Sequence, residues 1–199
     1  MAKLYFRYGT VGSAKTLNLL AVSHNYRHQG KKVLLMKPAL DTRFGKEWIK
    51  SRAGLEQEAD LLIHPEMSLL GIDFKGVSCI LVDEAQFLTE KTIDELRKIT
   101  HDWDLPIICY GLRTDFKSRL FEGSRRLMEL ADSIEEVKAT CHYCNRKSIM
   151  NLKYVNGRAV NEGASVDLGA EEKYLPACFK CYQSELQKKP ERNLAVLGV

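Results

Sequence analysis

Short apolar runs alternate with segments of helical spacing along the first 140 residues of the chain. Residues 3–8 predict a short strand. Residues 33–36 and 78–82 are continuous apolar runs, which is typical of parallel strands covered on both faces. Residues 106–110 predict a further strand. These four segments are the expected strands of one sheet.

Helical patterns lie between and after these strands. Residues 15–29 place Leu17, Leu20, Ala21 and His24 at helical spacing, and Gly30 ends this helix. A second helix begins after the capping residue Thr89 and ends near His101, and a third is predicted over 118–131. Strands that alternate with helices predict an α/β fold, with a mainly parallel sheet and helices on both faces. Residues 41–60 are too polar to assign.

The pattern changes after about residue 140. Asn156-Gly157 stands between two segments with strand character, residues 148–155 and 158–161, and this dipeptide is a strong signal of a β-hairpin. We therefore place a domain boundary near residue 139. The last residues, 194–199, are apolar and could dock on a neighbouring surface.

Composition and charge narrow the class of protein. The chain has 199 residues, 45% of them hydrophobic and 28% charged, as expected for a globular protein with a packed core. The net charge of +4 is mild and the basic residues are scattered, so no nucleic-acid partner is expected. Neither a signal peptide nor an apolar run long enough to span a bilayer is evident, so we expect a cytoplasmic protein without a membrane partner.

Four of the six cysteines form two C-x2-C pairs, which are typical of zinc sites. Four thiolates would complete a tetrahedral site and leave no position open for catalysis, so the predicted zinc is structural. His142 lies inside the first pair and is not needed as a ligand. Cys79 and Cys109 lie in apolar runs and are expected in the core. The predicted zinc ligands are Cys141, Cys144, Cys178 and Cys181.

The segment after the first strand nearly matches the phosphate-binding pattern G-x-x-x-x-G-K-[ST]. In such a loop, backbone N–H groups surround the phosphates, the lysine contacts the β- and γ-phosphates, and the hydroxyl ligates Mg²⁺. Ala14 stands where the pattern has its second glycine. Its Cβ is tolerable at negative φ and unfavourable at positive φ, and the sequence alone leaves φ open. The predicted nucleotide-binding residues are Gly9, Thr10, Val11, Gly12, Ser13, Ala14, Lys15 and Thr16.

The apolar run 78–82 ends in two carboxylates, Asp83 and Glu84. Asp83 is expected to hold Mg²⁺ together with Thr16. Adjacent residues of an extended chain point in opposite directions, so Glu84 can serve as a general base on an attacking hydroxyl. ATPases that activate water also place acids here. The two motifs therefore indicate nucleoside triphosphate chemistry but leave the acceptor open.

The order of these motifs resembles that of the type II thymidine kinases over residues 3–186. Further segments carry the likeness: residues 37–45 (KPALDTRFG), residues 83–87 (DEAQF), residues 110–116 (YGLRTDF) and residues 166–174 (VDLGAEEKY). Two positions depart from the family pattern. Ala14 replaces the loop glycine, and Ala170 replaces the second glycine of a Gly-Gly pair.

The resemblance implies an architecture and an activity. The fold would be a RecA-like P-loop domain over residues 1–139 and a zinc ribbon with a lasso loop over residues 140–187, followed by a flexible tail over residues 188–199. The activity would be phosphorylation of thymidine, and of deoxyuridine, at the 5′-hydroxyl by ATP in nucleotide salvage. Family members are usually homotetramers and are inhibited by thymidine triphosphate.

The resemblance also implies roles for individual residues. Glu84 would be the base, with Lys15 and Arg43 as further catalytic residues and Gln86 at the nucleotide. The lasso backbone near residues 166–169 would hydrogen-bond the thymine edge. The implied substrate-binding residues are Val11, Asp41, Phe87, Leu112, Phe116, Val166, Asp167, Leu168, Gly169 and Tyr174.

Two other classes compete with this interpretation. A P-loop ATPase that handles nucleic acid would need a basic surface with exposed aromatic residues, and no such cluster stands out in the sequence. A non-catalytic relative kept as a nucleotide-binding scaffold has Ala14 as its only support.

Overall fold

The computed structural model describes residues 1–42, 45, 47–163 and 173–188. Its main domain is built on a six-stranded sheet in the order β5-β2-β6-β7-β1-β8, and every strand pair is parallel. This arrangement confirms the predicted α/β class. The strands are β1 (Leu4–Tyr8), β2 (Lys32–Pro38), β5 (Leu61–Ile63), β6 (Val77–Val82), β7 (Ile107–Gly111) and β8 (Ser133–Glu136).

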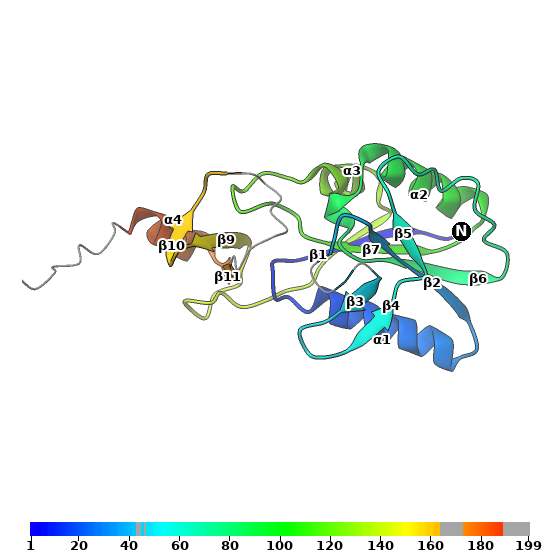
Figure 1. Ribbon diagram of the computed structural model, residues 1–199, viewed down its shortest axis with the longest axis horizontal. Helices are drawn as coiled ribbons and strands as arrows, with labels where there is room; N and C mark the ends of the chain where they lie inside the picture. Colours follow the sequence, from blue (N-terminus) through cyan, green and yellow to red (C-terminus); the bar gives the residue numbers. More distant parts are fainter. Residues whose placement is uncertain (43–44, 46, 164–172, 189–199) are drawn as a thin grey trace, which may run out of the picture.

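Helices cover both faces of this sheet (Figure 1). Helix α1 (Lys15–His28) packs on one face, where Leu19 and Leu20 join a buried cluster with Leu35 and Leu81. Helices α2 (Glu90–Asp102) and α3 (Glu122–Leu130) pack on the other face, through residues such as Ile93, Leu96, Ile99 and Leu127. The continuous apolar runs are therefore explained, since their side chains are buried on both sides of the sheet.

The buried face of α1 differs from the predicted one. Leu20 is buried, but Ala21 and His24 are exposed, while Leu19 and Ser23 are also buried. Lys15, Leu19 and Ser23 are four residues apart and form one stripe along the helix. The predicted helix is confirmed, but the spacing of its apolar residues does not identify the buried stripe, because this stripe contains a lysine and a serine.

The third helix begins at Glu122 rather than at residue 118. Asp115 accounts for the difference, because its Oδ1 accepts hydrogen bonds from the backbone N–H groups of Lys117 and Arg119, both at 2.9 Å. Such local bonds hold a loop conformation that competes with a helix. Ser118 also has a positive φ of 66°, which is incompatible with a helix at this position.

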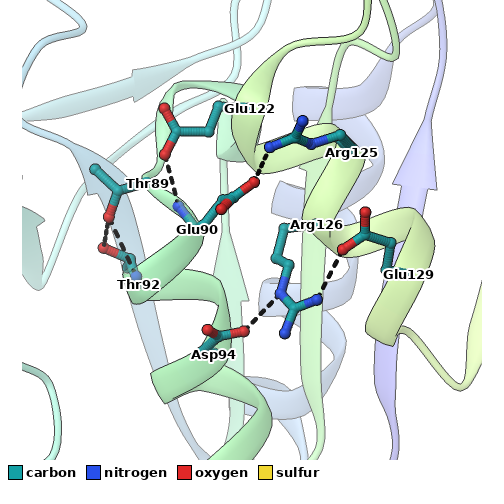
Figure 2. Close-up of polar contacts among 8 residues, drawn as sticks. All are labelled: Thr89, Glu90, Thr92, Asp94, Glu122, Arg125, Arg126 and Glu129. Carbon is teal, nitrogen blue, oxygen red and sulfur yellow. Dashed lines mark hydrogen bonds and ion pairs between the residues drawn. The ribbon is translucent and has the colours of Figure 1, made fainter.

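Charged side chains connect α2 and α3 at the surface (Figure 2). The Thr89 side chain accepts a hydrogen bond from the Thr92 N–H at 3.2 Å, which confirms Thr89 as the cap of α2. Arg126 lies between Asp94 and Glu129, with both contacts at 2.7 Å, and Arg125 pairs with Glu90. Exposed pairs of this kind contribute little to stability, so the apolar residues beneath them hold the helices together.

The polar segment that the sequence left unassigned contains the antiparallel pair β3 (Trp48–Lys50) and β4 (Glu56–Glu58). Two sheet strands, β5 and β8, were also not predicted. Both are short edge strands, and β8 carries the polar sequence Ser-Ile-Glu-Glu. Short, charged edges such as β8 are common because they discourage pairing with other chains, and the same property conceals β8 in the sequence. In contrast, β5 is apolar (Leu-Leu-Ile) but has only three residues.

The second unit is a three-stranded antiparallel sheet in the order β10-β9-β11, followed by helix α4 (Phe179–Gln187). Its strands are β9 (Met150–Val155), β10 (Arg158–Val160) and β11 (Lys173–Ala177). Asn156 and Gly157 both have positive φ, as the predicted hairpin turn requires. Residues 189–199, including the apolar end, lie outside the described residues. In the described part of the chain, no helix has the length and apolar character to cross a membrane.

Gly123 permits a close approach between α3 and the short helix η1 (Ala85–Phe87), which follows the Asp83-Glu84 pair. A Cβ at residue 123 would lie 2.5 Å from the Ala85 carbonyl oxygen and 2.7 Å from that of Leu88.

We expect Gly123→Ala to destabilise the fold by about 2 kcal/mol, since backbone atoms must move. Chemical denaturation measures the effect. Gly71→Ala is the matched control, because its Cβ meets no atom within 4 Å, and an equal loss there would contradict the explanation.

Candidate functional site

The motifs with predicted chemical roles lie at the carboxyl ends of neighbouring strands. The phosphate loop follows β1, Asp83 follows β6, and residues 112–116 follow β7. In the sheet β7 lies between β6 and β1, so these three segments are adjacent in space although they are far apart in sequence. Ligands of open α/β sheets bind outside the carboxyl ends of strands, which makes this edge the candidate active site.

The phosphate loop wraps around its own lysine. Lys15 Nζ donates hydrogen bonds to the Thr10 carbonyl oxygen at 2.7 Å and to Ser13 Oγ at 3.3 Å, and the side chain is buried. The Gly9 N–H donates to the Gly111 carbonyl oxygen at 3.2 Å, which ties the loop to the end of β7. Any Cβ at Gly9 would collide with the Ser13 side chain and with the Val137 carbonyl oxygen. The glycine at the start of the loop is therefore required by packing.

Ala14 adopts the left-handed conformation, with φ of 61° and ψ of 26°. This answers the question that the sequence left open, because positive φ is the unfavourable case for a residue with a Cβ. Ala14 is also the residue that precedes α1, and its side chain offers no capping bond to the helix. The loop therefore carries backbone strain at the position where the usual pattern has glycine.

Asp83 and Thr16 join the acidic strand end to the phosphate loop. Thr16 Oγ1 donates a hydrogen bond to Asp83 Oδ2 at 3.0 Å. Burial, together with the neighbouring Glu84 carboxylate, raises the pKa of Asp83 to about 7, although the Thr16 hydroxyl acts in the opposite direction. A hydroxyl and a buried carboxylate at this distance fit the oxygen ligands that Mg²⁺ prefers. A bound cation would also remove the cost of ionising Asp83.

Glu84 has the left-handed backbone conformation too, with φ of 49° and ψ of 35°. Its side chain is held by Gln86, whose Nε2 donates a hydrogen bond to Glu84 Oε2 at 2.5 Å. The Gln86 Oε1 atom accepts from the Leu112 N–H at 2.9 Å. Gln86 is buried, and both ends of its amide bind the protein, so it connects Glu84 to the segment after β7.

Asp41 pairs with a residue that the sequence analysis did not select. Lys37 Nζ lies 3.2 Å from Asp41 Oδ2, and it also donates to the Trp48 carbonyl oxygen at 3.0 Å. Both side chains of this ion pair are almost fully buried at the carboxyl end of β2. Arg43, the predicted neighbour of Asp41, lies outside the described residues. A lysine directly after the apolar run 33–36 was the available signal for Lys37.

The residues predicted to surround the thymine base of the substrate lie in two groups. Phe116 is buried against the second unit, with its ring centre 6.4 Å from that of Tyr174 and 4.9 Å from Lys153 Nζ. Phe87 is half-buried and packs edge-on against Phe121, and Leu112 is half-buried. The lasso residues Val166, Asp167, Leu168 and Gly169, as well as Ala170, lie outside the described residues. The substrate-binding roles stay predictions.

The four predicted zinc ligands converge. Their Sγ atoms all lie within 4.8 Å of one another, and the Cys144 sulfur is 3.7 Å from those of Cys178 and Cys181. Zn–S bonds of about 2.3 Å at tetrahedral angles require sulfurs about 3.8 Å apart, so the cluster fits zinc. His142 is exposed and is not part of the cluster. Cys79 and Cys109 are fully buried in the main domain, as expected.

Two buried residues of the second unit contact the phosphate loop and were missed by sequence reasoning. Thr10 Oγ1 lies 2.8 Å from Ser148 Oγ, and the Val11 N–H donates to Asn151 Oδ1 at 2.9 Å. A serine and an asparagine beside a predicted strand carry no signal of such contacts, since the partners lie 138 and 140 residues earlier in the chain.

The strain at Ala14 leads to a test of stability. We expect Ala14→Gly to stabilise the protein by about 1 kcal/mol, because glycine adopts positive φ without steric conflict. Thermal unfolding would then shift upward by about 2–4 °C. The matched control is Ala21→Gly, an exposed site within α1, where glycine should destabilise by about 1 kcal/mol. The same sign for both variants would contradict the account of the loop.

The raised pKa of Asp83 leads to a test of pH dependence. The ordinary pKa of an aspartate carboxyl is 3.8, whereas that of the buried Asp83 is about 7. Asp83 therefore destabilises the fold increasingly as the pH rises from 3.8 to 7. Asp83→Asn removes this penalty. In Mg²⁺-free buffer, we expect its melting temperature relative to the parent protein to increase by about 3 °C or more between pH 5.5 and pH 8. Asp73→Asn, at an exposed site, should show no such trend. A pH-independent difference for Asp83→Asn would contradict this electrostatic explanation.

Comparisons with known proteins agree with this geometry. A family model described as "Thymidine kinase" matches residues 2–182. The chain is 43% identical over 186 residues to the thymidine kinase of Lactococcus lactis subsp. lactis, with 92% of this chain and 97% of the relative covered. It is 42% identical to the thymidine kinases of Streptococcus gordonii (92% and 96% covered) and Streptococcus agalactiae (92% and 97% covered). The chain therefore belongs to the thymidine kinase family, which confirms the resemblance to the type II enzymes that its motifs indicated.

Proposed function

We propose that this protein transfers the γ-phosphoryl group of ATP to the 5′-hydroxyl of thymidine. The observation that carries the proposal is the hydrogen bond between Thr16 and Asp83, because it joins a phosphate loop to an acidic strand end with Glu84 directly beside it. The activity named for the relatives supplies the acceptor. Deoxyuridine, which has the same hydroxyl, is the proposed second substrate, and the proposed context is nucleotide salvage.

The loop residues Gly9–Thr16 would bind the phosphates through their backbone N–H groups at the N-terminus of α1. Lys15 would exchange its present bonds to Thr10 and Ser13 for contacts with the β- and γ-phosphates, where its charge stabilises the transferring group. Thr16 and Asp83 are the residues that would hold Mg²⁺, which supplies positive charge to the phosphates when it is bound.

Glu84 is the proposed general base. An alcohol must lose its proton as it takes up the phosphoryl group, and a carboxylate within reach can accept that proton. The left-handed conformation of Glu84 supports the role, since strain of this kind is often found at functional residues. Gln86, which we assign to the nucleotide site, keeps the Glu84 carboxylate in place through its 2.5 Å hydrogen bond.

The remaining roles are proposals on the same basis. Arg43 would balance charge on the transferring group, and Asp41 would lie beside Arg43 as a substrate-binding residue. The thymine base of the substrate would lie among Val11, Phe87, Leu112, Phe116 and Tyr174. The backbone of Val166, Asp167, Leu168 and Gly169 would recognise the thymine edge, and closure of this lasso would exclude water, so that transfer prevails over hydrolysis.

The cysteine cluster is proposed to hold a structural Zn²⁺. With four thiolate ligands the ion would have no open position for a substrate, so its contribution is to the folding of the ribbon. We propose that the two domains end near residues 139 and 187. We also propose a cytoplasmic homotetramer that is inhibited by thymidine triphosphate.

Replacement of the proposed base tests the mechanism. We expect Glu84→Gln to lower kcat for thymidine phosphorylation by about 100-fold or more, because the amide cannot accept the proton, while ATP binding is retained. Purified zinc-loaded protein is assayed with ATP and Mg²⁺ by formation of thymidine monophosphate. Glu66→Gln at an exposed site is the matched control and should leave kcat unchanged.

Substrate controls separate the competing functions. Product should form with thymidine but not with deoxycytidine or without nucleoside. Nucleic-acid-stimulated ATP hydrolysis without nucleoside would favour an ATPase that handles nucleic acid, and ATP binding without product would favour a scaffold. Unchanged thymidine phosphorylation by Glu84→Gln or by Lys15→Met would overturn the proposed mechanism.

A further inference from the structure

The zinc ribbon touches the phosphate loop through two buried side chains. Ser148 lies just before β9 and Asn151 within it, and their exposed fractions are 2% and 4%. They contact Thr10 and Val11, which form the first half of the loop. The unit that carries the cysteine cluster therefore reaches the residues that would bind the phosphates of ATP.

The direction of each hydrogen bond follows from the partners. Ser148 Oγ donates its single hydrogen to the Ala139 carbonyl oxygen at 3.0 Å, so Thr10 Oγ1 must be the donor in the 2.8 Å contact with Ser148. Asn151 Nδ2 donates to the Thr114 carbonyl oxygen at 2.8 Å, and its Oδ1 accepts from the Val11 N–H. Both side chains therefore have one defined orientation.

Asn151 joins three segments that belong to different parts of the proposed site. Its backbone lies in β9 of the ribbon, its amide oxygen binds the phosphate loop, and its amide nitrogen binds Thr114 in the segment between Leu112 and Phe116. A second contact runs in parallel, because Arg113 Nη2 donates to the Ile149 carbonyl oxygen at 3.4 Å.

The phosphate loop needs such external contacts. Ala14 has a positive φ, and a strained conformation persists only where its surroundings determine it. Within the loop, Lys15 and the Ser13 N–H both bind the same acceptor, the Thr10 carbonyl oxygen. The hydroxyl of Thr10 and the N–H of Val11 are anchored by the ribbon instead.

We propose that Asn151, assisted by Ser148, is a positioning residue that holds the phosphate loop in the shape that binds ATP. The inference rests on the proposed function, because it assumes that this loop is the ATP site. It adds that the ribbon takes part in nucleotide binding by supporting the loop, beyond any contact of its lasso with the nucleoside. A ribbon that only stabilises the fold would not change ATP affinity.

Binding of β,γ-imido-ATP with Mg²⁺ tests the proposal by isothermal titration calorimetry, well below the melting temperature of each variant. Asn151→Leu keeps the approximate shape of the side chain and removes both hydrogen bonds. We expect its Kd to rise about tenfold, with the zinc content unchanged. The matched control is Tyr154→Phe, which removes the bonds to Tyr143 and Glu185 within the ribbon, both 2.8 Å long, and should leave Kd unaltered.

A double-mutant cycle provides a second measurement that does not depend on the folding of Asn151→Leu. Thr10→Val and Ser148→Ala each remove the hydrogen bond between these two residues, and Ser148→Ala also removes the bond to the Ala139 carbonyl oxygen. We expect each to raise Kd about threefold, and the double variant to be no weaker than the weaker single variant. Strictly additive effects, or single effects below a factor of 1.5, would overturn the role of Ser148.

The remaining outcomes also decide the question. A folded, zinc-replete Asn151→Leu with a Kd within twofold of the parent overturns the proposal, even if its melting temperature falls. An equal rise in Kd for Tyr154→Phe overturns it too, since general loosening of the ribbon would then be the cause. If the parent protein does not bind β,γ-imido-ATP, the proposed function fails together with this inference.

Discussion

Parallel pairing of β6, β7 and β1 brings the carboxyl ends of three strands to one edge of the sheet, and the candidate active site depends on this arrangement. Only β7 lies between β1 and β6 in the sheet. The segment after β1 therefore remains near the acidic end of β6, and Thr16 forms a hydrogen bond with Asp83 there. The buried apolar clusters on the two faces hold the strands in this register. Slippage of one strand would separate the hydroxyl from the carboxylate.

Strain and buried charge accumulate at this edge. Ala14 and Glu84 both adopt left-handed backbone conformations, and Asp83 is buried with a raised pKa. The apolar core beneath offsets these unfavourable terms, while a nucleotide with its metal ion would satisfy the charge directly. Backbone strain and shifted pKa values often occur together at functional sites, which agrees with this edge being the candidate active site.

The ribbon connects to this edge through polar contacts whose geometry is defined. Asn151 holds the phosphate loop and the segment after β7 at once, and Tyr182 donates a hydrogen bond to the Phe116 carbonyl oxygen at 2.5 Å. The cysteine cluster lies in the core of the unit that carries Asn151, where Cys141 and Cys178 are buried with Leu152. The two units therefore contact each other at the candidate site.

The sequence by itself determined the strand–helix order of the main domain, the phosphate loop, the Asp83-Glu84 pair, the hairpin at Asn156-Gly157 and the four cysteines. These are local signals, in which neighbouring residues suffice to specify a turn, a run or a spacing. Only the tertiary structure decided the φ of Ala14, the Lys37–Asp41 pair, the edge strands β5 and β8, and the contacts of Ser148 and Asn151. Each of these depends on groups distant in sequence or on packing around the backbone, which a local pattern of residue types does not record.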